Sequence, residues 1–201
     1  MDSFFICYFN IWVSVMVNFL WDNFFRKGHK ENSVISTLSQ NYMFEVLSPK
    51  ELKFMEQIVH VRNFRPGEVI FSQGELGVGM YIIMKGSVNI FVEDPYAADP
   101  SQKRTFITRL KQGDFFGEIA LVEKNGRRTA SATAVDDVTL IGFFKPDLYE
   151  LIDRNPRTGV KILTRLSEVL GRRLKETSEK FSELKRELRQ LKILKDKESS
   201  K

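Results

Sequence analysis

Short apolar runs alternate with turn residues through the middle of the chain, from residue 59 to residue 144. β-branched and aromatic side chains are frequent in these runs, and Gly, Pro and Asp separate them, as expected for strands joined by turns. Many short strands at this spacing are typical of a sandwich, a jelly roll or a small barrel. The predicted strands are Val69–Phe71, Tyr81–Met84, Ser87–Val92, Arg104–Leu110, Thr129–Ala134 and Val138–Phe144.

Helical signals lie on the N-terminal side of this β-rich region. Ser48 predicts the start of one helix, because Pro49 suits the first helical turn and Glu51 completes a capping box. A short helix is also expected within the polar segment 28–47. Both helices therefore precede the first predicted strand.

The first residues of the chain form a separate apolar segment. Residues 3–21 carry no charge and are rich in Phe, Ile, Val and Trp, so the run could just span a bilayer. Asn10, Ser14 and Asn18 interrupt it, and the start lacks the positive region of a signal peptide. If translation begins at Met16, the segment is instead an amphipathic helix packed on the domain or on a second copy. The sequence leaves membrane contact through this segment open.

One long helix is predicted from about Thr158 to about Lys195, after a shorter helix over residues 146–154. Asn155 is the expected N-cap residue between them. Along the long helix, apolar residues recur mostly three and four positions apart, which is typical of a coiled-coil seam. The predicted seam residues are Leu163, Leu166, Leu170, Leu174, Phe181, Leu184, Leu188 and Leu191. A parallel homodimer through residues 158–195 would cover them, whereas a solvated surface helix would not.

These elements predict a mainly β protein with flanking helices. The fold class is a β-roll, that is, a double-stranded β-helix or jelly roll, with N-terminal helices and a long C-terminal coiled-coil helix. We expect residues 1–44 to form an aromatic helix and linker, and residues 45–157 to form the β-roll domain. Residues 158–201 would form the long helix and a charged tail.

Cysteine and histidine are too scarce for several kinds of site. Cys7 is the only cysteine, which excludes an internal disulfide and a cysteine-rich metal centre, and it suits a reducing cytoplasm. His29 and His60 are the only histidines, so a β-roll metalloenzyme with several histidine ligands on its strands is disfavoured. We expect no catalytic site, no metal and no cofactor.

The net charge of +5 is unevenly distributed along the chain. Residues 161–201 hold more basic than acidic side chains, whereas the rest of the chain is nearly balanced. The basic excess therefore belongs to the long helix and not to a DNA-reading domain. No recognition helix can be placed after it, so sequence-specific DNA binding is not expected.

Two short motifs offer groups that suit a small sugar phosphate. Gly117 permits close approach of the backbone to a ligand, and the residues after it can begin a short helix with outward N–H groups. Arg128 offers a fork of donors for a phosphate, and Thr129 adds a hydroxyl. Glu118 is an acceptor for a sugar hydroxyl. A cyclic monophosphate requires such a set within one small pocket.

These motifs resemble the phosphate-binding cassette of cyclic nucleotide-binding domains. Such domains occur in catabolite-activator-type regulators, in the regulatory subunits of protein kinase A and in cyclic-nucleotide-gated channels. The resemblance is carried by residues 116–121 and 128–130, and upstream by residues 73–77 and 80–83. It covers roughly residues 45–175, and the long last helix is similar to the hinge helix of the family.

The resemblance implies a role for individual residues. Glu118 should accept the ribose 2′-hydroxyl, Arg128 should pair with the cyclic phosphate, and Arg127 should point elsewhere. The last helix should cover the base, and Arg172 and Arg173 lie at about the right place, although both could be solvated. The residues expected at the ligand are Gly117, Glu118, Ile119, Ala120, Arg128, Thr129, Ala130 and Arg173.

The expected ligand is cyclic AMP, with cyclic GMP as the alternative, because cyclic AMP is commoner among single-domain members of the family. Met80, Ile82 and Val92 are candidates for the walls of the base pocket or for the core, and we expect two of the three to be core. The resemblance implies a sensor in which the ligand repositions the dimer helix to control a separate protein partner. A coiled-coil adaptor without a ligand is the competing interpretation.

Overall fold

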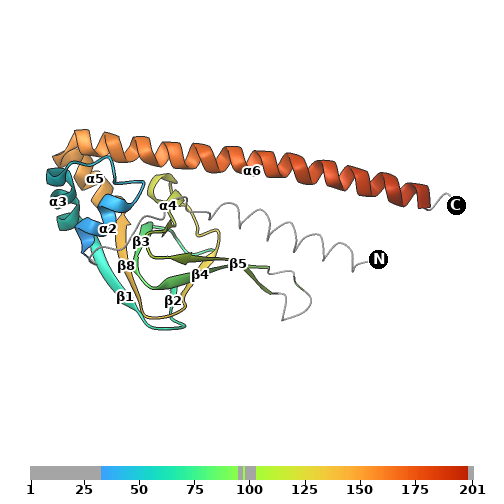
Figure 1. The fold of residues 1–201 in the computed structure, drawn as a ribbon, viewed down its shortest axis with the longest axis horizontal. Coiled ribbons are helices and arrows are strands. Elements are labelled where there is room, and N and C mark those ends of the chain that lie inside the picture. The colour runs from blue at the N-terminus through green and yellow to red at the C-terminus, as the bar shows by residue number, and fades with distance from the viewer. Residues whose placement is uncertain (1–32, 95–96, 98–102, 199–201) are drawn as a thin grey trace.

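The computed structural model of the chain describes residues 33–94, 97 and 103–198, with side chains described as far as residue 193. Within these ranges the strands form two four-stranded sheets, and every ladder is antiparallel (Figure 1). The first sheet contains, in spatial order, β1 (His60–Phe64), β8 (Val138–Phe144), β3 (Gly79–Lys85) and β6 (Phe115–Phe116). The second contains β2 (Val69–Phe71), β7 (Ser131–Ala134), β4 (Ser87–Glu93) and β5 (Arg104–Lys111). This architecture confirms the predicted β-roll.

The sequence analysis does not predict two of the strands, β1 and β6, and it predicts β7 two residues too long. β1 is almost wholly exposed, so it has no buried face that alternation could reveal, and β6 has only two residues. Thr129 and Ala130 do not belong to β7, which begins at Ser131. They lie instead in a bend next to the cavity described below.

Five helices are described around the sheets (Figure 1). They are α2 (Val34–Gln40), α3 (Pro49–Ile58), α4 (Ile119–Val122), α5 (Lys145–Arg154) and α6 (Pro156–Glu198). The predicted capping box is confirmed at the start of α3, where Ser48 and Glu51 satisfy each other's backbone N–H groups. The predicted cap at Asn155 is also confirmed, since its side chain accepts from Thr158 N at 3.3 Å.

The first turns of α6 pack on the chain's own domain, which corrects part of the predicted dimer seam. Leu166 is 1% exposed in the same hydrophobic cluster as residues of α2, α3 and α5, and Leu163 and Leu170 pack against that cluster. The apolar side of these turns is therefore already covered. Beyond them, α6 extends away from the domain (Figure 1). Most of its apolar side chains there are exposed, from Leu174, at 68%, to Ile193, at 55%, whereas Leu184 is half-buried.

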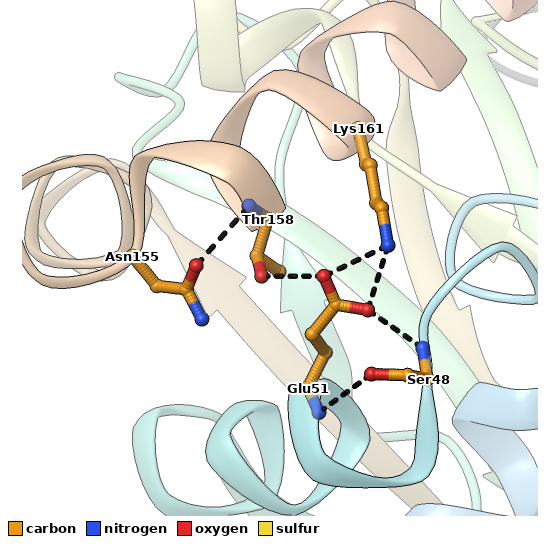
Figure 2. Close-up of polar contacts among 5 residues, drawn as sticks. All are labelled: Ser48, Glu51, Asn155, Thr158 and Lys161. Atoms are coloured by element: carbon orange, nitrogen blue, oxygen red, sulfur yellow. Dashed lines mark hydrogen bonds and ion pairs between the residues drawn. The ribbon is translucent and has the colours of Figure 1, made fainter.

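Glu51 connects the start of α3 to the start of α6 (Figure 2). Its carboxylate accepts hydrogen bonds from Lys161 Nζ at 2.8 Å and from Thr158 Oγ1 at 2.9 Å, in addition to the capping bond from Ser48 N at 2.7 Å. Burial opposes ionisation of this carboxyl, but the hydrogen bonds from Lys161, Ser48 and Thr158 outweigh it and lower the pKa of Glu51 to about 2. One side chain thus fixes the base of the long helix.

Glu51→Gln should destabilise the fold near neutral pH. Because the folded-state pKa lies below the ordinary value of 4.5, the ionised carboxylate stabilises the fold above pH 4.5, and this contribution is lost as the pH falls towards 2. We expect a loss of about 1–3 kcal/mol, reduced by the solvent exposure of Lys161. Chemical denaturation at pH 7 and at pH 3 should show the difference from wild type shrinking in acid. Glu56→Gln, at an exposed position of the same helix, should change little; an equal loss there would contradict the role of Glu51.

The N-terminal predictions fall outside the described residues. The segment 3–21 and the alternative helix starting at Met16 both lie within residues 1–32. Among the residues that are described, no helix has the length and apolar character that crossing a bilayer requires. The three-part division of the chain stays a prediction.

Candidate functional site

A cavity of about 340 Å³ lies between the segment 117–130 and one side of α6. Residues from distant parts of the chain meet there, since β4, the bend before β7 and the middle of α6 all contribute. All eight residues that the sequence predicts for the site line this cavity: Gly117, Glu118, Ile119, Ala120, Arg128, Thr129, Ala130 and Arg173. The fold therefore brings the predicted site together in one place.

The backbone of Arg128 is held by the glycine-rich turn that precedes β3. Gly74 N donates to Arg128 O, and Arg128 N donates to Glu75 O, both at 2.8 Å. Two residues farther along, Gly77 N donates to Gly126 O at 2.9 Å. The turn and the segment before β7 thus pair like two short strands, which fixes the direction of the Arg128 side chain.

The Arg128 guanidinium is a buried charge without a carboxylate partner among the described residues. The residue is 7% exposed, its Cζ lies 4.1 Å from the centre of the Phe71 ring, and Nη1 donates to Gly117 O at 3.2 Å. Burial lowers the pKa of Arg128 below its usual value, and Tyr81, Glu118 and Glu75 oppose that shift. An arginine stays protonated even so. A buried, unpaired positive charge is costly, so the site favours an anion at this point.

The two carboxylate oxygens of Glu118 differ, because one accepts a hydrogen bond and the other accepts none within the described part of the chain. The residue is 1% exposed, and its Oε1 accepts a hydrogen bond from Arg173 Nη1 on α6. Its Oε2 is buried and has no hydrogen-bond partner among the described residues. An unsatisfied buried acceptor costs about 1–3 kcal/mol, more when it is charged. A ligand hydroxyl that donates to Oε2 would remove this cost.

Because Gly117 has no side chain, the Arg128 guanidinium has room beside it. Its φ is +77°, a conformation that residues with a side chain rarely adopt, and a Cβ atom there would lie 2.4 Å from Arg128 Nη1. The positive φ favours glycine, and an added Cβ would displace the Arg128 guanidinium. The amide of Ala120, one of the residues expected at the ligand, donates within the turn to Gly117 O at 3.2 Å.

Gly117→Ala should therefore disturb the site more than the small change in size suggests. The new methyl group would push the guanidinium away from its position and strain the backbone, by about 1–3 kcal/mol for the backbone alone. We expect anion binding at Arg128 to weaken at least about tenfold. Calorimetry with the nucleotide ligand proposed below measures this directly. Gly171→Ala, where nothing lies within 4 Å of the added atom, is the matched control, and equal losses would contradict the steric explanation.

The sequence model described as "Cyclic nucleotide-binding domain" matches residues 61–155. Residues 61–155 therefore form a domain of this family. The matched range includes Glu118 and Arg128, the two buried charged residues of the cavity wall, whereas Arg173 comes from α6 beyond it.

Known members of the cyclic nucleotide-binding family are similar to a large part of the chain. The Cyclic AMP receptor protein of Thermus thermophilus is 34% identical over 134 residues, which are 67% of this chain and 57% of that protein. The cAMP-activated global transcriptional regulator CRP of Salmonella typhimurium is 35% identical over 127 residues, 62% of this chain and 55% of that protein. The crystal structure of the Thermus thermophilus Catabolite Activator Protein is similar with a TM-score of 0.63 and 30% identity, covering 72% of this chain and 63% of that one. The chain thus spans less than two thirds of each relative.

The remaining candidates in the cyclic nucleotide-binding domain are Arg127 and the three apolar residues considered for the base pocket. Arg127 lies at the rim of the cavity, but its guanidinium donates to Gly74 O at 2.6 Å and is exposed. Met80 and Ile82 are fully buried in a hydrophobic cluster, and of the three apolar candidates only Val92 lines the cavity. Two of the three are therefore core.

The contribution of α6 to the domain's cavity was only partly foreseen. Leu170, Leu174 and Thr177 line it together with Arg173. These positions are spaced i, i+3, i+4 and i+7, so they share one side of the helix. Helical spacing from Arg173 could have found all three. Arg172 points away, with its Cζ 5.1 Å from the Tyr42 ring centre.

Proposed function

We propose that the domain binds a cyclic nucleotide, with cyclic AMP preferred and cyclic GMP as the alternative, and that it works as a regulatory sensor and not as an enzyme. One observation carries this proposal. Arg128, whose buried guanidinium has no carboxylate partner among the described residues, and Glu118, whose Oε2 accepts no hydrogen bond there, line the same cavity; the first suits an anion and the second a hydroxyl. A cyclic nucleotide carries an anionic phosphate and a ribose hydroxyl next to each other.

In this proposal the phosphate takes the place of the missing counter-charge. Arg128 pairs with the phosphate, and Thr129 adds its hydroxyl from the neighbouring position of the cavity wall. Glu118, held in place by Arg173, accepts the ribose 2′-hydroxyl on Oε2. The volume of about 340 Å³ lies in the range of small-molecule pockets, about 300–1,000 Å³.

The choice of cyclic AMP is supported by the names of the relatives. One is a cyclic AMP receptor protein and another is a cAMP-activated regulator. A solved structure with 28% identity and a TM-score of 0.51 is titled "cAMP bound PfPKA-R (141-441)". The second of these names also describes a regulator, and we extend regulation to this chain, which we place in the cytoplasm.

Helix α6 is the proposed output of the sensor. Leu170, Arg173 and Thr177 line the cavity, and so does Leu174. Leu174 is also the first of the exposed apolar residues in the part of the same helix that extends away from the domain, which we call the stripe: Leu174, Phe181, Leu188, Leu191 and Ile193. A ligand that binds one position of α6 more tightly than another shifts the helix towards that position. We propose that the stripe pairs with a second copy of the chain, so that the ligand resets a dimer and through it a protein partner.

Titration of the purified chain with cyclic AMP, cyclic GMP and a cyclic dinucleotide tests the ligand. We expect saturable, one-to-one binding of cyclic AMP, weaker binding of cyclic GMP and none of the dinucleotide. If none of the three nucleotides binds, the sensor proposal is wrong and the coiled-coil adaptor without a ligand remains.

Phe181→Lys combined with Leu188→Lys should dissociate the proposed dimer. The two side chains are 51% and 43% exposed on the free part of α6, so the substitutions should not disturb the domain. Loss of their burial in both copies should weaken association by about 100-fold or more. Light scattering after size exclusion measures the mass. Glu179→Lys, at an exposed acidic position two residues before Phe181, is the control; a wild-type monomer, or an unchanged mass in the double variant, would contradict pairing through the stripe.

A further inference from the structure

Four exposed aliphatic side chains surround a close contact between α4 and the turn before β3. Gly77 packs on Ala120, since a Cβ on the glycine would lie 2.7 Å from the alanine Cβ. Leu76 and Val78 flank Gly77, and Ile119 and Val122 belong to the helix that contains Ala120; we call these four residues the α4 patch. Their exposed fractions are 59%, 48%, 42% and 49%. Single exposed aliphatic residues are ordinary on protein surfaces, but a group of them marks a contact site.

The α4 patch is a fixed part of the fold. Gly77 N donates to Gly126 O at 2.9 Å, and Lys145 N donates to Val78 O at 2.8 Å. The Lys145 ammonium group also donates to the carbonyl of Glu123, directly after α4. The patch therefore requires no rearrangement to receive a partner.

Residues 3–21 of the same chain need a surface of this kind. They form an uncharged run that contains both tryptophans of the protein, Trp12 and Trp21. A run so apolar is unfavourable in water unless something covers it. None of its neighbours in sequence can do so, because residues 22–32 are largely polar or charged.

Helix α2, near the start of the described chain, and α4 contribute to the same hydrophobic cluster. Leu38 comes from α2 and Leu121 from α4. Directly after α2, the Asn41 side chain donates to Gly113 O at 3.0 Å, close in sequence to α4. Residues between Trp21 and Ser33 can span about 40 Å when extended. The apolar run can therefore reach the patch of its own chain without strain.

We propose that residues 3–21 dock on the α4 patch of the same chain. Leu76 and Val122 would supply the centre of the contact, and Ile119 would form its edge, because Ile119 also lines the nucleotide cavity. The α4 patch would then be the surface that covers residues 3–21 in water. The proposal does not depend on a bound nucleotide.

Tryptophan fluorescence of the full chain tests the docking without a label, because both tryptophans lie in the proposed occupant. The measurement uses lipid-free and detergent-free buffer without nucleotide. Wild-type emission should be blue-shifted and protected from acrylamide compared with the urea-unfolded chain. Leu76→Gln combined with Val122→Gln should lower the ratio of docked to undocked chain about tenfold, so that emission shifts to the red and quenching rises. Val69→Gln, at a position 52% exposed on β2 and far from α4 in Figure 1, should leave both unchanged.

Three outcomes would overturn the proposal. Fully exposed tryptophans in the wild type would show that nothing covers the segment in water, and that it requires a membrane. Protection that survives in the double variant would place the segment on another surface. Protection that disappears on dilution, together with a fall in mass, would show that the segment is covered by a second copy. The double variant should still unfold cooperatively, and its thermal midpoint separates loss of docking from loss of fold.

Discussion

Arg128→Ala should weaken cyclic AMP binding by at least about 100-fold. The guanidinium is buried and has no carboxylate partner among the described residues, so a bound phosphate would be its counter-charge. Charge-assisted hydrogen bonds of this kind are worth about 1.5–3 kcal/mol each, and an arginine fork makes two. Their loss corresponds to a factor of about 100 to 10,000 in affinity. Calorimetric titration measures it.

Arg127→Ala is the matched control for this variant. The neighbouring guanidinium donates to Gly74 O at 2.6 Å and lies at the cavity rim, so its removal should change affinity only a few-fold. Arg128→Lys should fall between the two, because it keeps the charge and loses the fork. Thermal melting without ligand shows whether each variant is folded. Equal losses in the two alanine variants would remove Arg128 from the proposed role.

Glu118→Gln should reduce the affinity for cyclic AMP about 10- to 100-fold and abolish discrimination against its 2′-deoxy analogue. In the wild type, Oε2 is the buried oxygen without a partner, and the 2′-hydroxyl would donate to it. A hydrogen bond to a charged group contributes about 1.5–3 kcal/mol. The analogue lacks this donor, so its binding should be weak to the wild type and should change much less on substitution. The ratio of the two affinities therefore reports on this one contact.

Glu123→Gln separates this contact from general electrostatics. Glu123 lines the same cavity but is exposed, and its substitution also removes one negative charge. Discrimination against the 2′-deoxy analogue should be preserved in it. If the Glu118 variant still discriminates as the wild type does, the sugar hydroxyl lies elsewhere.

Much of the fold follows from short-range patterns. The β-roll, the strand Val138–Phe144 and the capping box of Ser48 and Glu51 all agree with the sequence-based predictions. Each depends on residues a few positions apart, through turn chemistry, alternation or a local hydrogen bond. The same holds for the cassette, because Glu118 and Arg128 are close in the chain. The two missed strands, β1 and β6, lack such a local signal.

For the long helix α6, short-range patterns do not predict which surface covers its apolar side. Its period revealed an apolar side, and one continuous dimer seam was inferred from it. The structure divides that side: Leu166 is buried against the chain's own helices, whereas Leu174 is exposed next to the cavity. A period shows that a side chain needs cover, but not which surface provides it.

The sequence by itself determined the β-roll, the helix starts and the set of polar groups that suit a sugar phosphate, because these are encoded by neighbours along the chain. Only the tertiary structure decided that Arg173 contacts Glu118 while Arg172 lies against Tyr42, and that Val92 lines the cavity while Met80 and Ile82 fill the core. Adjacent residues on a helix differ in direction by about 100°, so the packing of α6 on the domain selects one of them. That packing depends on contacts between residues far apart in sequence, which no local pattern records.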